Sequence, residues 1–103
     1  MKQIIDGKMF DTEIAKLVAT NQYSQPGDFH YWREELYITK KGVWFIFGKG
    51  GPLTKYAIST GNKPKSGGST IRPLTAKEAI EWLEKADKLD ALEKYFASEI
   101  EDA

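Results

Sequence analysis

The run VWFIF at residues 43–47 carries an apolar side chain at every position. Successive side chains of a strand point to opposite faces of the sheet, so a strand built from this run is covered on both sides. We therefore predict that it lies centrally in a sheet. The chain has 103 residues, including three tryptophans, five tyrosines and five phenylalanines, which supply the core of a single domain spanning residues 1–103.

Further strands are predicted on either side of this run. Residues 33–39 alternate, with Leu36 and Ile38 on one face, and the glycine of the following KKG turn suits a left-handed position. Another strand is predicted for residues 54–59, where Tyr56 and Ile58 share a face.

The segment after these strands is rich in glycine. Residues 61–69 contain no apolar side chain to anchor them, which predicts a mobile surface loop. Residues 70–72 then form a short edge strand in this prediction, because Pro73 has no N–H to donate to a neighbouring strand.

The first residues predict a hairpin and then a helix. Residues 2–5 and 8–10 flank Asp6-Gly7, a pair that fits a type I′ turn. Asp11 suits the N-cap of a short helix over residues 12–19, in which Ile14, Leu17 and Val18 share one face.

The C-terminal third predicts helix. The sequence TAKE is a capping box, in which the hydroxyl of Thr75 and the carboxylate of Glu78 each accept a hydrogen bond from the other residue's backbone N–H. Apolar residues continue with helical spacing over residues 79–100. This pattern fits either one bent helix or two, the second capped by Asp87 or Asp90.

Together these elements predict an α+β fold. A mainly antiparallel sheet of about four or five strands packs against the C-terminal helices, with a short N-terminal helix at its side.

No apolar run approaches the ~20 residues that span a bilayer, and the first residues lack the apolar stretch of a signal peptide. We therefore expect a cytoplasmic protein that does not enter a membrane. The absence of cysteine excludes disulfides and thiolate metal sites.

Charge is segregated along the chain although the formal net charge is zero. Residues 36–77 contain eight cations and no acid, whereas residues 78–103 contain nine acids and three lysines. This distribution indicates a binding protein with two electrostatically distinct surfaces.

The basic middle region supplies the first candidate binding residues. Its cations fall mainly in predicted turns and loops, where they can meet phosphates or an acidic partner. Aromatic residues nearby can supply stacking surfaces or protein contacts. The alternative is that the lysines only solubilise turns and guard sheet edges while the aromatic residues form core. The candidates are Lys40, Lys41, Lys49, Lys63, Lys65 and Arg72, with the aromatic residues Tyr31, Trp32 and Trp44.

The acidic C-terminal region supplies the second set. Glu81–Lys85, Glu84–Lys88 and Asp90–Lys94 have the i, i+4 spacing of helical ion pairs, which predicts a salt-bridged solvent face. The remaining acids can instead contact a basic surface of a partner. These candidates are Glu78, Asp87, Glu93, Glu99, Glu101 and Asp102.

Catalytic and cofactor motifs are not evident. The glycine-rich segment at residues 48–52 lacks the pattern and following helix of a phosphate-binding loop, so we expect no nucleotide or other cofactor. His30, the only histidine, lies near Asp28, Glu34 and Glu35 in the sequence, which leaves a small enzyme with a histidine base as a further alternative. One histidine and scattered acids do not indicate a metal site.

Three stretches of the chain have distinctive sequences: residues 6–12, 36–57 and 71–84 read DGKMFDT, LY…KYA and IRPLT…EWLE. They resemble short accessory proteins of bacterial phages, plasmids and conjugative elements. Some small proteins of this setting are anti-CRISPR inhibitors, which bind a host effector complex stoichiometrically. The resemblance implies a mobile-element protein that obstructs a nucleic-acid-processing complex.

These observations predict a non-catalytic binding protein. Its expected partner is a host protein or nucleoprotein complex, with a CRISPR effector implied by the resemblance. The alternative is a nucleic-acid-binding module that uses the basic sheet rim and loops. The sequence leaves the oligomeric state open.

Overall fold

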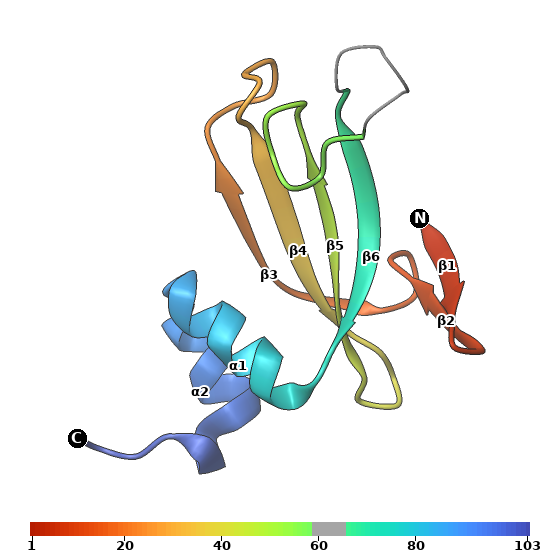
Figure 1. The fold of residues 1–103 in the computed structure, drawn as a ribbon. Helices are drawn as coiled ribbons and strands as arrows, with labels where there is room; N and C mark the ends of the chain where they lie inside the picture. Colours follow the sequence, from red (N-terminus) through yellow and green to blue (C-terminus); the bar gives the residue numbers. More distant parts are fainter. Residues whose placement is uncertain (59–65) are drawn as a thin grey trace.

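A computed structural model of the chain describes residues 1–58 and 66–103. Within these residues, two sheets and two helices make up the fold (Figure 1). A two-stranded hairpin contains β1 (Lys2–Ile5) and β2 (Lys8–Asp11). The main sheet has the order β3-β4-β5-β6, with all neighbours antiparallel, and its strands are β3 (Lys16–Tyr23), β4 (Trp32–Ile38), β5 (Trp44–Gly50) and β6 (Gly68–Leu74). The helices are α1 (Ala76–Lys85) and α2 (Leu89–Phe96), followed by a 3-10 turn, Ala97–Glu99.

The central position of the apolar run is confirmed. β5 pairs with β4 on one side and β6 on the other. On one face Trp44 and Ile46 pack against the helices, in a helix-side core with Leu36, Leu74, Ala79, Leu83 and Phe96. On the other face Phe45 packs with Phe10 of the hairpin, in a hairpin-side core with Tyr37 and Ile71. The two apolar faces of the run are thus covered by different layers.

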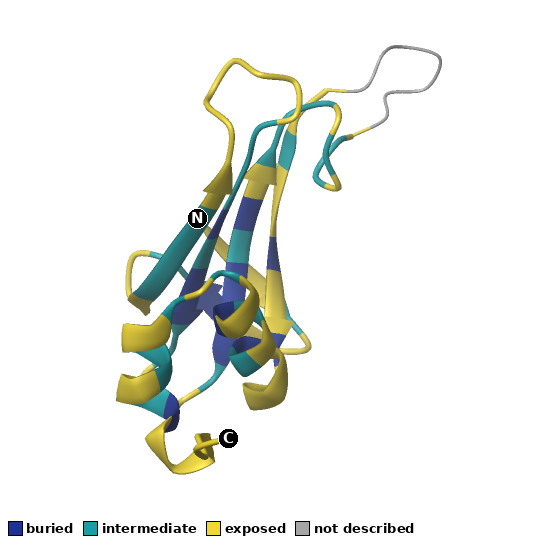
Figure 2. Cartoon of the chain, turned by 90° about the vertical axis from the view of Figure 1, so that its left-hand side faces the viewer, coloured by how far each residue is buried: buried dark blue, intermediate teal, exposed yellow. Residues whose placement is uncertain are grey.

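Both covering layers contact the same end of the main sheet. Figure 1 shows α1, α2 and the hairpin near the end of β4 and β5 that leads to the Thr39–Val43 turn, and Figure 2 shows the buried strand segments concentrated there. The opposite end carries the connections between β3 and β4 and between β5 and β6. We call it the loop end and define it as residues 23–32, 49–53 and 67–69. The molecule is elongated, with extents of 50 × 34 × 19 Å.

Several predicted turns and caps are confirmed. Asp6 and Gly7 have φ of 51° and 76°, as a type I′ turn requires, and Gly42 has φ of 84°. The Thr75 hydroxyl accepts from the Glu78 N–H at 3.1 Å, and the Glu78 carboxylate accepts from the Thr75 N–H at 2.9 Å. The capping box therefore forms as the sequence predicts.

The short N-terminal helix predicted over residues 12–19 is wrong. Asp11 starts one turn, because its carbonyl accepts from the N–H groups of Ile14 and Ala15 and its side chain accepts from Glu13. The chain then enters β3, which pairs with β4 along its whole length. A helix of eight residues is marginal by itself, and pairing with an adjacent strand outweighs the weak helical spacing of Ile14, Leu17 and Val18.

The strand predicted for residues 54–59 is also wrong. Residues 52–56 form turns, and Ile58 makes only an isolated bridge to Ser66. The Thr54 hydroxyl donates to the Gly51 carbonyl at 2.9 Å and accepts from the Tyr56 N–H at 3.1 Å. These local bonds favour a turn over an extended strand. Ser59 lies outside the described residues.

The remaining expectations are refined. β6 is an edge strand, as predicted, but it extends from Gly68 to Leu74 and includes the end of the predicted loop; residues 61–65 of that loop lie outside the described residues. The C-terminal pattern forms two helices, separated at Asp87, which has φ of 56°. Neither Asp87 nor Asp90 caps α2, because Lys88 occupies the N-cap position without a side-chain cap.

Candidate functional site

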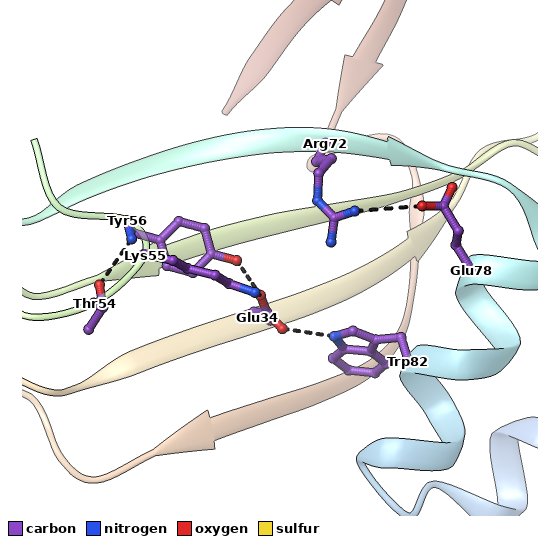
Figure 3. Close-up of polar contacts among 7 residues, drawn as sticks. All are labelled: Glu34, Thr54, Lys55, Tyr56, Arg72, Glu78 and Trp82. Carbon is purple, nitrogen blue, oxygen red and sulfur yellow. Dashed lines mark hydrogen bonds and ion pairs between the residues drawn. The ribbon is translucent and has the colours of Figure 1, made fainter.

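A buried carboxylate lies between the main sheet, α1 and the connection after β5. Alternation along β4 places Glu34 on the helix-facing side with Leu36, and Glu34 is 5% exposed. Its Oε1 accepts from Trp82 Nε1–H of α1 at 2.9 Å, and its Oε2 accepts from Lys55 Nζ at 2.8 Å and from the Tyr56 hydroxyl (Figure 3). One side chain thus joins three elements. We call Glu34, Lys55, Tyr56 and Trp82 the Glu34 centre.

Gly48 makes room for this arrangement. A Cβ at Gly48 would overlap the Tyr56 ring and hydroxyl, so the ring lies where β5 has no side chain. The turn held by Thr54 brings Lys55 and Tyr56 to Glu34 together (Figure 3). Gly48 lies within β5, and its lack of a side chain leaves the space that the Tyr56 ring occupies.

Burial and hydrogen bonding act in opposite directions on these groups. Burial raises the pKa of Glu34, but the hydrogen bonds from Lys55, Tyr56 and Trp82 together outweigh it and hold the pKa below its ordinary value. Burial and the adjacent carboxylate raise the pKa of Tyr56. Glu34 is therefore a charged acceptor with both oxygens engaged, which suits a structural role better than that of a base.

A cavity of about 510 Å³ adjoins the Glu34 centre. Its walls include Trp32 and Glu34 from β4, Arg72 from β6 and Glu81 from α1. Arg72 Nη1 lies 3.9 Å from the Glu78 carboxylate, which is already used in the capping box (Figure 3). Cations and carboxylates face one another across this cavity, so neither sign of charge dominates it.

The opposite face of the sheet carries a second local network. Arg33 Nε donates to the Glu35 carboxylate at 3.1 Å, and the Tyr37 hydroxyl donates to it at 2.8 Å. Arg33 also donates to the Gln22 side chain at 2.9 Å. Burial, followed by the contact with Glu35, raises the pKa of Tyr37 to about 12. These charges satisfy one another within the fold.

The structure separates the predicted basic residues instead of gathering them. Lys40 and Lys41 are exposed on the turn between β4 and β5, whereas Lys49 is exposed near the other end of β5, about 20 Å away by strand geometry. Arg72 faces the helices and Glu78. Lys63 and Lys65 lie outside the described residues. A single basic rim is not formed by the described cations.

The predicted aromatic residues have different environments. Trp44 is 6% exposed and packs against Tyr95 and Phe96, so its prediction as a partner-binding residue is wrong. An apolar central strand buries its rings on both faces, which is the core role that the sequence left open. Tyr31 and Trp32 are half-buried at the loop end, where Trp32 stacks on Tyr23 with ring centres 6.5 Å apart.

The predicted acidic residues are exposed but dispersed. Glu78 is paired with Thr75 and Arg72 rather than free, and Asp87 lies in the turn between the helices. Glu93 lies on α2, and Glu99, Glu101 and Asp102 lie in the C-terminal segment. Among the described residues, the predicted i, i+4 ion pairs do not form: no salt bridge joins Glu81 to Lys85, Glu84 to Lys88 or Asp90 to Lys94.

His30 is an exposed residue of the loop end. Its backbone N–H donates to the Asp28 carboxylate at 2.8 Å, and its Nδ1 lies 3.4 Å from the same oxygen. Glu34, which follows it closely in sequence, is engaged in its own centre. No cluster of three or more His, Asp or Glu residues that could hold a metal ion occurs within residues 1–58 and 66–103.

Three large apolar or aromatic side chains are exposed at the loop end. Tyr23, Phe29 and Leu53 are 57%, 64% and 56% exposed. The two loops are joined because the Phe29 carbonyl accepts from the Leu53 N–H at 3.0 Å. A hollow of about 550 Å³ between these loops is lined by Phe29, Tyr31 and Lys49, among other residues.

Sequence reasoning missed the Glu34 centre and part of the loop end. One signal was available for Glu34. It is separated from Leu36 and Ile38 by even numbers of positions, so an alternating strand places its carboxylate on the same face, toward the core. Its partners lie twenty-two and forty-eight positions away in sequence, which local patterns cannot reveal.

No protein-family model matches this chain, and neither a curated protein nor a solved structure matches it. Among residues 1–58 and 66–103, the helices are too short to span the apolar part of a bilayer.

Proposed function

We propose that the protein is a non-catalytic binding protein that contacts a partner protein through its loop end. The supporting observation is the group of exposed apolar side chains at the end of the sheet that the helices and the hairpin leave uncovered. Clustered apolar side chains with a polar rim are typical of protein interaction sites. Here Asp28, His30 and Lys49 supply the polar rim.

Aromatic residues support this location. Trp32 and Tyr31 are half-buried, so part of each ring is already ordered by the fold while the rest stays accessible. Tyrosine and tryptophan that are held in place lose little conformational entropy on binding and are frequent at interface hot spots. The predicted residues Tyr31, Trp32 and Lys49 therefore remain candidates for partner binding.

The partner that we propose is a nucleic-acid-processing defence complex of a bacterial host, with a CRISPR effector as its first candidate. The resemblance of residues 6–12, 36–57 and 71–84 to mobile-element proteins supports this choice. A protein of this kind acts in the cytoplasm and inhibits its target by stoichiometric binding, without chemistry of its own.

The test compares two pairs of apolar-to-serine changes. Phe29→Ser with Leu53→Ser alters the loop end, and Met9→Ser with Ile14→Ser removes two similarly exposed apolar side chains near the hairpin. Each protein is mixed with purified CRISPR effector complexes, and co-elution and cleavage of target DNA are measured. We expect the wild type and the hairpin variant to bind and inhibit an effector, and the loop-end variant to bind at least about tenfold more weakly.

Two results would oppose the proposal. Equal loss of binding in both variant pairs would remove the loop end as the contact surface. Undiminished cleavage at a molar excess of wild-type protein, with every effector tested, would reject the inhibitor function.

Direct binding of nucleic acid is the second candidate. It is favoured by one observation: Lys8, Lys40 and Lys41 border the same hollow of about 490 Å³ beside the hairpin. Binding through these lysines predicts a mobility shift of duplex or single-stranded DNA that weakens steeply as salt increases. A lack of any shift at low salt would discard this candidate.

A further inference from the structure

The two edges of the main sheet differ in how they are protected. β6 contains Arg72 and Pro73, and charged residues and proline both discourage pairing with another strand. β3 contains no proline, and its only charged residue is Lys16 at its start. The ammonium of Lys16 lies over the Tyr95 ring of α2, 5.8 Å from its centre, rather than along the edge. Apart from a bulge near its start, this eight-residue edge strand thus lacks the proline and the charged side chains that usually keep another strand away.

The geometry of β3 suits pairing with a further strand. A bulge interrupts its register with β4 between Leu17 and Ala19, but from Ala19 to Tyr23 every residue pairs in regular order. β3 is the terminal strand of the sheet, so it has one hydrogen-bonded neighbour and one open side (Figure 1). A strand edge presents a row of backbone N–H and C=O groups to any extended chain beside it.

A hollow of about 350 Å³ runs between this edge and the beginning of α2. Val18, Ala19 and Thr20 form its sheet wall. Its helical wall includes Leu89, which is 60% exposed, and the exposed carboxylates of Asp87 and Asp90. A strand added to β3 would place alternate side chains in this hollow, between an apolar surface and two acids.

Charge decides which occupant fits. The hollow is lined by two acids, Asp87 and Asp90, and by one lysine, Lys88. A second copy paired through β3 would add another pair of the same acids at this junction, which like-charge repulsion opposes. A basic segment meets attraction instead.

We propose that β3 is a docking edge for an extended segment of a partner protein in which lysine or arginine alternates with apolar residues. The segment adds an antiparallel or parallel strand to the sheet, its backbone bonds to β3, and its basic side chains lie near Asp87 and Asp90. This surface is separate from the loop end and rests on its own observations. It can therefore hold whether or not the loop end binds a CRISPR effector.

The test uses the isotope-labelled full chain and a synthetic probe. The probe is a peptide of alternating lysine and valine, matched to the eight residues of β3; the control peptide has glutamate in place of lysine. Amide shifts and hydrogen exchange are followed by NMR during titration. We expect the lysine peptide to shift β3 and the start of α2 and to slow exchange of β3 amides, and the glutamate peptide to leave both unchanged.

Matched variants separate strand addition from general charge attraction. Thr20→Lys adds to β3 a charged side chain of the kind that discourages strand pairing. Thr70→Lys makes the same change on the other edge strand, β6. We expect the first to abolish the protection of β3 amides and the second to preserve it. Asp87→Asn with Asp90→Asn should weaken binding of the lysine peptide by roughly three- to tenfold, since exposed ion pairs contribute little each.

Three outcomes would overturn the inference. Shifts confined to the acidic C-terminal segment, without slowed exchange in β3, would show charge attraction alone. Equal effects of Thr20→Lys and Thr70→Lys would remove β3 as the docking edge. Concentration-dependent protection of β3 in the absence of peptide would identify a second copy as the occupant. The amide spectrum of each variant checks that it is folded.

Discussion

Burying the Glu34 carboxylate costs hydration free energy, yet its ion pair and hydrogen bonds stabilise the fold. A carboxylate that is 5% exposed loses most of its hydration, so its charge must be compensated by donors within the protein. Lys55, Tyr56 and Trp82 supply three such donors. Because Trp82 comes from α1 and Lys55 and Tyr56 come from the connection after β5, the ion pair and hydrogen bonds also fix the relative positions of β4, α1 and this connection.

The first prediction concerns the charge of Glu34. Glu34→Gln keeps the shape of the side chain but turns an amide N–H₂ toward groups that are themselves donors. We expect the free energy of unfolding near neutral pH to fall by about 1–3 kcal/mol. Urea denaturation followed by tryptophan fluorescence measures it. Glu93→Gln, which changes an exposed carboxylate on α2, is the matched control and should have an effect below about 0.5 kcal/mol.

The pH dependence of this effect has a definite sign. The folded-state pKa of Glu34 is lowered from the ordinary 4.5, so ionised Glu34 stabilises the fold fully above that value. Its contribution is lost as the pH falls through the lower folded-state pKa. The wild type and Glu34→Gln should therefore converge in stability in acid. A constant difference across the acidic range would contradict the pKa shift.

At the scale of elements, the connection after β5 depends on a close fit to the sheet. The Tyr56 ring occupies the space that a side chain on Gly48 would need, and its hydroxyl reaches Glu34. The connection is therefore held by one ring and one turn, rather than by regular strand pairing.

The second prediction tests that fit. Gly48→Ala should lower the free energy of unfolding by about 1–3 kcal/mol, because the added methyl overlaps the Tyr56 ring. In a Tyr56→Ala background the same change should be neutral or stabilising, since alanine restricts the unfolded chain more than glycine does. A double-mutant cycle by urea denaturation gives the coupling. Equal costs in both backgrounds would show that Tyr56 is not the obstacle.

Local sequence signals predicted some elements and failed at others. The Asp6-Gly7 turn and the Thr75 capping box need only neighbouring residues, and both form. Residues 12–19 have helical spacing but join a sheet because β4 offers backbone partners. Residues 54–59 were predicted as a strand because they alternate, although Tyr56 has its decisive contacts with Gly48 and Glu34.

At the scale of the whole molecule, stability should be uneven. Both cores lie where the helices and the hairpin cover the sheet, whereas the loop end has exposed apolar residues and none of the buried core residues (Figure 2). Regions with few buried apolar contacts open locally at lower free energy than core strands.

The third prediction follows from this division. Within β4 and β5, the backbone amides of Leu36, Phe45 and Ile46 should exchange with solvent most slowly, and those of Trp32 and Gly50 faster by about tenfold or more. Hydrogen exchange by NMR, at a pH where opening and closing are fast relative to chemical exchange, measures the opening free energy of both groups in one sample. Uniform protection along the two strands would contradict the division.

Charge segregation along the sequence did not become segregation in space. The sequence joins Lys40, Lys41 and Lys49 in one basic stretch, but antiparallel strands carry the chain from one end of the sheet to the other between them. The candidate site at the loop end was predictable only in part, through Tyr31, Trp32 and Lys49. Its exposed residues Phe29 and Leu53 come together through backbone contacts between two distant loops, which composition does not encode.

The position of Phe96 has a consequence for biosynthesis. Trp44 emerges from the ribosome long before Phe96, the residue that stacks on it with ring centres 5.1 Å apart. During that interval the apolar face of the sheet that α1 and α2 later cover is exposed to solvent. The hairpin, which precedes the sheet in sequence, can already cover the other face. A chain that has exposed β5 before α2 presents Trp44 and Ile46 to solvent, so we expect chaperones that hold extended chains to bind it until Phe96 has emerged.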